Sequence, residues 1–190
     1  MDLRPGDIVF ERSESWFGRA IRWFTRGRYE PPTRINHVGM IVSGRRSGEA
    51  EVVEALWRVV KRPLSKMTGA IEVWGLDGGP WQEKALSEKA ESYIGRRYGW
   101  WKLIAHLIDC LLTKIRGREV YWLRRLLRLD EYPICSWLVA YAYQTIFPKD
   151  VHAFGIPAHL VTPDDIHDYV KKAAGWHWHL VYQREAAKPS

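Results

Sequence analysis

The segment from Cys135 to Phe147 is apolar along almost its whole length and is made of residues that favour a helix. A helix that is apolar on all sides is stable only when other elements bury it. Short apolar runs bounded by turn residues predict strands at residues 8–10, 36–42, 51–56, 71–74 and 176–182. Further helices are predicted at residues 13–25 and 81–94 and after Thr162. The pattern therefore indicates an α+β fold.

Length and composition set the remaining limits. The chain has 190 residues, of which 46% are hydrophobic and 27% charged. This predicts one globular domain over residues 1–190 and excludes a disordered chain. Two cysteines are too few for a disulfide scaffold or a four-cysteine zinc site. The sequence has no apolar stretch of ~18 residues and no apolar signal core, so we expect a cytoplasmic protein with reduced thiols.

The charge and the tryptophan content are unusual. Lys and Arg number 29 against 22 Asp and Glu, which gives a net charge of +7, and the chain contains 11 Trp. A basic surface favours anionic partners, and Trp suits interfaces that are part apolar and part wet. No nucleic-acid motif accompanies the basic residues. We therefore expect an anionic membrane surface or a cell-wall polymer as a partner, and we do not expect nucleic acid; an acyl or peptide substrate follows only from the candidate site residues and the resemblance described below.

Residues 100–130 form a basic and aromatic insert. Its apolar residues recur at helical spacing and the run is interrupted near Gly117, which predicts two amphipathic helices. In one interpretation both helices pack on the core. In the other, the insert is a lid or an element that lies on a membrane surface, so that peripheral membrane association is expected.

Cys135 is the candidate nucleophile. It stands at the start of the predicted apolar helix, where the helix dipole favours a thiolate and the first-turn N–H groups can stabilise an oxyanion. The alternative is a small buried cysteine that only packs. Cys110 lies within an apolar helical run, so we expect it to pack.

A thiolate nucleophile needs a base and a group that orients the base. His37 shares a strand face with Gly39, whose small size leaves room for a ligand or for the helix of Cys135. Glu54 is a lone acid in an apolar strand and can meet His37 if the two strands pair. Glu51 is the competing acid, on the opposite face. We expect no metal site.

Five short motifs follow one another along the chain: LRPGDI at 3–8, NHVG at 36–39, VEA at 53–55, GRRYGW at 95–100 and CSWLV at 135–139. In this order they resemble the circularly permuted branch of the NlpC/P60 papain-like cysteine hydrolases, the YiiX/YebB-like group. In the unpermuted family the Tyr and Cys-Ser motifs precede the His-Val-Gly strand. The resemblance implies an α+β, circularly permuted papain-like fold, with a small antiparallel sheet or barrel packed against helices.

The resemblance also implies site residues and a reaction. It makes Cys135 the nucleophile, His37 the general base and Glu54 the third polar group, and it places Tyr98 and Ser136 on the substrate and oxyanion side. The implied protein is a cysteine peptidase or amidase that cleaves a peptide, a peptidoglycan stem peptide or an N-acyl compound without a cofactor. A lipid acyl hydrolase or acyltransferase with the same Cys-His pair, and a non-catalytic binding module on the same fold, are the alternatives.

Overall fold

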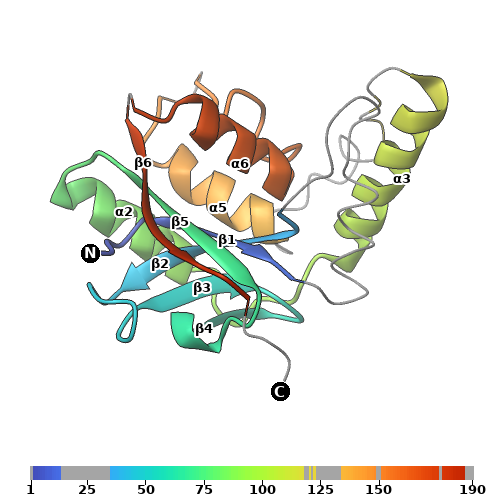
Figure 1. Cartoon of the computed structure of the whole chain (residues 1–190). Coiled ribbons are helices and arrows are strands. Elements are labelled where there is room, and N and C mark those ends of the chain that lie inside the picture. Colours follow the sequence, from blue (N-terminus) through green and yellow to red (C-terminus); the bar gives the residue numbers. More distant parts are fainter. Residues whose placement is uncertain are drawn as a thin grey trace.

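The computed structural model describes residues 2–13, 35–117, 120, 122, 134–148, 151–175 and 177–186. Within these ranges the chain forms a six-stranded sheet with helices packed against it (Figure 1). This arrangement confirms the α+β class and the predicted antiparallel sheet.

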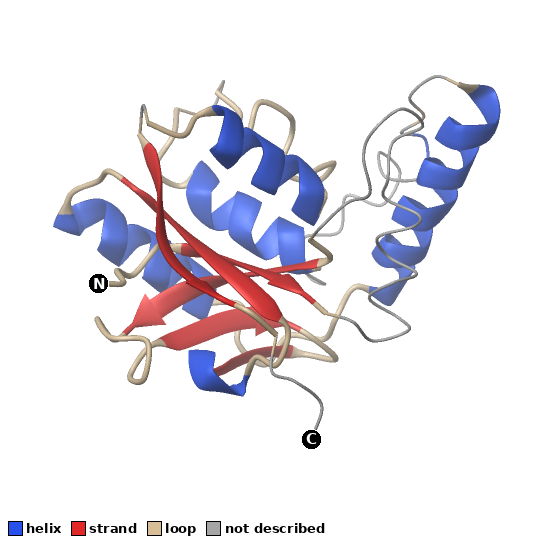
Figure 2. Ribbon diagram, viewed as in Figure 1, coloured by secondary structure: helices blue, strands red, loops and turns tan. Residues whose placement is uncertain are grey.

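The sheet has the strand order β4-β3-β2-β1-β5-β6, and each neighbouring pair is antiparallel. Figure 2 shows the strands as one strongly twisted layer. The strands are β1 (Ile8–Arg12), β2 (His37–Ser43), β3 (Glu51–Ala55), β4 (Val59–Pro63), β5 (Ala70–Leu76) and β6 (Trp178–Arg184).

The described helices are α2 (Pro80–Glu91), α3 (Trp100–Arg116), α5 (Cys135–Gln144) and α6 (Pro163–Lys172), with a short 3₁₀ turn, η1 (Leu64–Lys66). Helix α5 is buried almost throughout, as its apolar sequence requires, and packs against β2, β3, α2 and α6. Helix α6 begins as predicted, because the Thr162 side chain accepts a hydrogen bond from the backbone N–H of Asp165.

Both faces of the sheet are covered. On one face β1 and β2 pack with α2, α5 and α6 around side chains such as Phe10, Met40 and Leu138. On the other face the curved sheet closes over a second core that includes Ile41 and Leu64. Alternate residues of β2 therefore enter different cores, which fixes the register of this strand.

The predictions for the following three segments differ from the structure. Strand β4 was not predicted; it forms because its backbone pairs with β3 and because Val59 bonds to Gly95 and Arg96. The strand predicted at residues 71–74 continues through Gly75 to Leu76 in β5, and a Cβ atom at Gly75 would come within 2.8 Å of the Val181 side chain on β6. Helix α2 was predicted to continue to residue 94, but it ends at Glu91 and turns lead to Gly95, whose φ is 84°.

Some predictions fall outside the described residues. These are the helix at 13–25 beyond its first residue, most of the second helix of the insert, and the side chain of Cys110. The first helix of the insert is α3, and the predicted interruption is confirmed by Gly117, which ends α3 in the left-handed conformation with φ 67°. No helix among the described residues is long and apolar enough to cross a membrane.

Candidate active site

Cys135 is the first residue of α5 and is 7% exposed. The residue before it, Ile134, has extended backbone geometry and supplies no side-chain cap. The N–H groups of the first helical turn therefore point out of the helix beside the thiol, without an Ncap side chain to accept from them. Because α5 packs against β2 and β3, this end of the helix reaches the start of β2.

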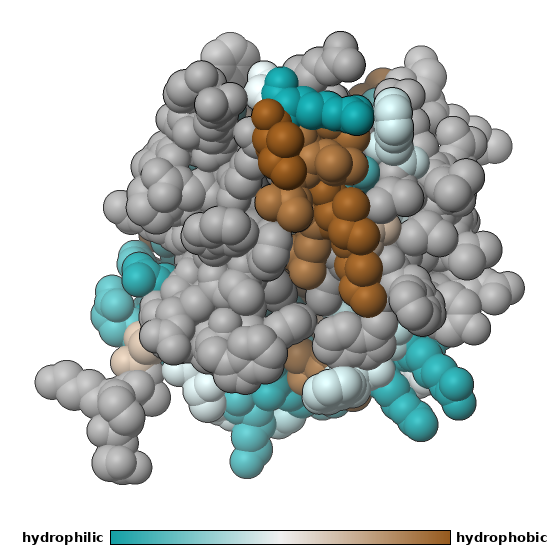
Figure 3. Space-filling view, turned by 90° about the vertical axis from the view of Figure 1, so that its right-hand side faces the viewer, coloured by the Kyte–Doolittle hydropathy of each residue, from teal (hydrophilic) through white to brown (hydrophobic). Residues whose placement is uncertain are grey.

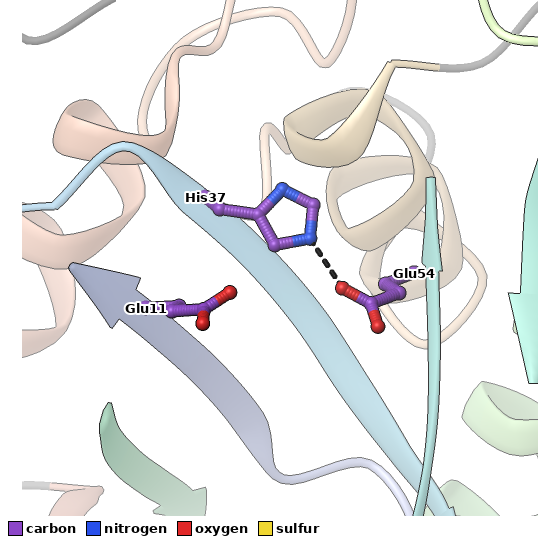
Figure 4. Close-up of side chains that lie close together, drawn as sticks. All are labelled: Glu11, His37 and Glu54. Atoms are coloured by element: carbon purple, nitrogen blue, oxygen red, sulfur yellow. Dashed lines mark hydrogen bonds and ion pairs between the residues drawn. The ribbon is translucent and has the colours of Figure 1, made fainter. Parts of the chain in front are cut away.

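His37 is the first residue of β2 and is mostly buried. Its Nε2 atom lies 2.6 Å from an Oε2 atom of Glu54 on β3 (Figure 4). Gly39, not His37, stands directly opposite Glu54 in the antiparallel register. The Glu54 side chain therefore reaches His37 along the diagonal of the strand pair, a distance that a long side chain can span.

Gly39 makes this diagonal contact possible. A Cβ atom at this position would lie 2.8 Å from Val52 Cγ1, 3.1 Å from the carbonyl oxygen of Val53 and 3.2 Å from Glu54 Cβ. The space beside Gly39 is thus taken by strand β3. The prediction that it admits a ligand or the helix of Cys135 was wrong, and the close approach of two strands is the physical reason.

Glu54 is fully buried and is held from two sides. One oxygen bonds to His37, and the other accepts from the Nε atom of Arg62 on β4. Burial raises the pKa of Glu54, but the bonds and charges of His37 and Arg62 outweigh burial and lower it to about 2. The carboxylate is therefore ionised at neutral pH and can compensate a positive charge on His37.

His37 also interacts with Cys135. Burial lowers the pKa of His37, but hydrogen bonds to Cys135 and then to Glu54 raise it well above its usual value. Because Nε2 faces Glu54, the nitrogen left for the thiol is Nδ1. The ring therefore links the sulfur to the carboxylate, the arrangement that a general base of a thiol nucleophile requires.

Tyr98 also interacts with Cys135. Its backbone N–H donates to the carbonyl of Trp57 at 3.2 Å, and the turn before it is tied to β4 by the bond from Gly95 N–H to the Val59 carbonyl. Burial, followed by the charge of Cys135 and a hydrogen-bonding interaction with it, raises the pKa of Tyr98 well above its usual value. The phenol therefore keeps its proton and can donate it in a hydrogen bond.

The structure thus brings four of the five predicted side chains together: Cys135, His37, Glu54 and Tyr98. The fifth, Ser136, follows Cys135 in α5 and is fully buried, and its hydroxyl has no hydrogen-bond partner in the described part of the chain. Glu51 bonds instead to Ser43 and Lys61, as its position on the opposite face requires.

Sequence reasoning missed Arg62 and Glu11. Glu11 stands directly opposite His37 in the register of β1 and β2, is 7% exposed, and accepts the backbone N–H of Gly69 at 2.8 Å. Figure 4 shows Glu11, His37 and Glu54 gathered across neighbouring strands. The prediction ended the first strand at Phe10, two residues before β1 ends at Arg12. The signal for Glu11 would have been an acidic residue that continues a buried strand.

No protein-family model matches the sequence, and no curated protein matches it either. Among solved structures the chain is similar to the crystal structure of metalloprotein yiiX from Escherichia coli O157:H7, described as DUF1105. The TM-score is 0.59 and the sequence identity 20%, over 97% of this chain and 99% of that chain. At this identity the similarity shows the fold alone, so the chain has a YiiX-like α+β fold.

Proposed function

We propose that the chain is a cysteine hydrolase that cleaves an acyl bond, most simply an amide, through a thioester acyl-enzyme. One observation carries the proposal: Glu54 holds one nitrogen of His37 at 2.6 Å, and Cys135, at a helix N-terminus, lies close enough to His37 and Tyr98 to raise the pKa of both. A packing cysteine needs neither partner. The permuted papain-like fold and one domain over residues 1–190 belong to the same proposal, which the YiiX-like fold supports.

The reaction follows from the order of the contacts. His37 takes the proton of the Cys135 thiol, and the sulfur forms a bond to the carbonyl carbon of the substrate. The tetrahedral intermediate collapses as the C–N bond breaks, and the leaving amine takes the proton from His37. Water then attacks the thioester while His37 accepts its proton, and the C–S bond breaks to release the acid and restore the thiol.

Two groups are placed to stabilise the oxyanion. The first-turn N–H groups of α5 lie beside the sulfur, and the phenol of Tyr98 interacts with Cys135. Preorganised donors of this kind act most strongly where water is excluded. Glu54 does not take a proton in this scheme, because its pKa of about 2 keeps it ionised; it orients His37 and compensates the imidazolium.

The name of yiiX raises the question of a metal. Donor atoms of Glu11, His37 and Glu54 lie within 4.8 Å of one another, as do those of Asp164, His167 and Asp168. In the first group both oxygens of Glu54 are already bonded, and one of the partners is the cationic Arg62. A metal ion there would have to displace His37 and would meet a guanidinium, so this group fits a metal poorly.

In the second group the Nε2 atom of His167 is bonded to Glu72 at 3.0 Å and Asp168 is exposed. Asp164 lies in the first turn of α6, where its charge complements the helix dipole. The proposed reaction therefore uses no metal.

The test is acyl-enzyme formation with p-nitrophenyl acetate, a small activated ester. We expect a burst of p-nitrophenolate and an acetyl group on Cys135, located by peptide mass spectrometry. The burst is expected to disappear in Cys135→Ala and to slow sharply in His37→Ala, while Cys110→Ala serves as the matched thiol control. It should survive EDTA. If neither cysteine is acetylated, the proposal is contradicted and a binding module remains. If the burst is lost with EDTA, the proposal is contradicted and a metal-dependent reaction remains.

A lipid acyl substrate is the second candidate, because an apolar stripe on α3 is exposed to solvent. After the acyl-enzyme test, peptide, peptidoglycan and phospholipid panels distinguish the substrates. Turnover of phospholipid alone favours the lipid acyl hydrolase, whereas turnover of peptide or peptidoglycan amides favours the first form of the proposal.

A further inference from the structure

Helix α3 exposes apolar side chains in an unusual place. Ile104, Ile108, Leu111 and Ile115 are between 38% and 70% exposed. Ala105 and Asp109, on another side of α3, are buried, and Asp109 is fully buried. An ordinary surface helix does the reverse, with its apolar stripe on the core and its acids in water.

The exposed residues form one stripe. Their spacing of four, three and four residues keeps them within a narrow sector of a helix with 3.6 residues per turn. Figure 3 shows a continuous hydrophobic band on the side of the molecule where α3 lies. We name these four residues the α3 stripe. A contiguous apolar surface of this kind marks an interaction site.

Helix α3 and the sequence that follows it are rich in basic and aromatic residues. The guanidinium of Arg116, the last residue of α3, lies 5.1 Å from the ring centre of Trp122, which is 67% exposed. Over residues 100–130 the sequence contains seven Lys or Arg and three acids, one of which is the buried Asp109. An apolar stripe beside cations and an exposed Trp is the pattern of a helix that lies in a lipid headgroup region.

We propose that α3 docks the protein on an anionic phospholipid bilayer, lying in the plane of the surface with the α3 stripe among the acyl chains. The basic residues favour an anionic bilayer over a second copy of the chain as the partner, because in a dimer the positive charges of the two copies would repel each other. The inference does not depend on the proposed hydrolase activity, since binding is measured without substrate.

The test is co-sedimentation of the full chain with vesicles of phosphatidylcholine alone or mixed with phosphatidylglycerol. We expect binding to the mixed vesicles, weaker binding to phosphatidylcholine, and a loss of binding at high salt. Ile104→Ser/Ile108→Ser removes half of the α3 stripe and is expected to weaken binding at least about tenfold. Replacing Arg124, Arg125 and Arg128 by Gln is expected to remove the preference for phosphatidylglycerol.

The matched control is Ile94→Ser/Leu180→Ser, which removes two side chains that are each 44% exposed but lie off α3. It should bind as wild type does, and so should Cys135→Ala. Circular dichroism checks that each variant is folded, and light scattering measures its molecular mass in solution. Wild type that stays in solution with both vesicles, or a stripe variant that binds unchanged, overturns the proposal. The proposal is also overturned if wild type is a dimer in solution and the Ile104→Ser/Ile108→Ser variant is a monomer.

Discussion

Glu54 bonds to the Nε2 atom of His37 at 2.6 Å across the position of Gly39, which has no side chain to intervene. Three adjacent strands contribute to this contact, because Arg62 on β4 holds the other oxygen of Glu54. The orientation of His37 toward Cys135 therefore depends on backbone register and not on a flexible loop. The predictions below test separate parts of this arrangement.

Gly39→Ala is expected to disturb the pair without touching either partner. The new methyl group would meet Val52, Val53 and Glu54 at 2.8–3.2 Å. We expect a loss of about 1–3 kcal/mol in the free energy of unfolding, as for other overpacked sites, together with a reduced rate of Cys135 acylation. Gly48→Ala is the matched control, because a Cβ atom there has no neighbour within 4 Å. Equal behaviour of the two variants would show that Gly39 has no such role.

Glu54→Gln is expected to change how stability depends on pH. The pKa of Glu54 falls from 4.5 to about 2 in the folded chain. Its stabilising contribution is therefore complete above about pH 4.5 and is lost as the pH falls toward about 2, amounting to about 3 kcal/mol over this window. His37, whose pKa is raised, stays protonated throughout the window and adds no slope.

Chemical denaturation between these two pH values measures the effect. Wild type should lose stability more steeply than Glu54→Gln as the pH falls. Glu49→Gln, at an exposed position just before β3, should resemble wild type. Parallel curves for wild type and Glu54→Gln would mean that Glu54 is not ionised in the folded state.

Tyr98→Phe removes one hydroxyl from the site and leaves the ring in place. If this hydroxyl stabilises the developing oxyanion, kcat should fall on the order of 10²-fold while KM changes little. Steady-state kinetics with p-nitrophenyl acetate or an active amide substrate give both constants. A change confined to KM would assign Tyr98 to binding instead. Tyr93→Phe, a buried tyrosine on the same connection, is the control for loss of a phenol.

Much of the candidate site could be predicted from the sequence because it depends on local signals. Cys135 precedes an apolar run that had to be a buried helix, and His37 opens a strand with clear alternation. The contact between His37 and Glu54 was conditional on the pairing of two strands, and the register of β2 and β3 supplies that condition.

The remaining parts depend on tertiary pairing. Residues 59–63 lack a clear alternation of apolar and polar side chains, and β4 forms because β3 and the turn before Tyr98 bond to its backbone. Arg62 could not be assigned to Glu54 without that strand. Gly39 was correctly singled out as small, but only the structure shows that its neighbour is β3 and not α5.

The rate at which iodoacetamide labels Cys135 tests the central claim most directly. Peptide mass spectrometry follows Cys135 and Cys110 separately in wild type and in His37→Ala across a range of pH. The account predicts that Cys135 of wild type reacts faster than a free thiol at about pH 6 and that this excess disappears in His37→Ala. Labelling of Cys135 that is no faster than that of a free thiol, or that is unchanged without His37, would contradict it.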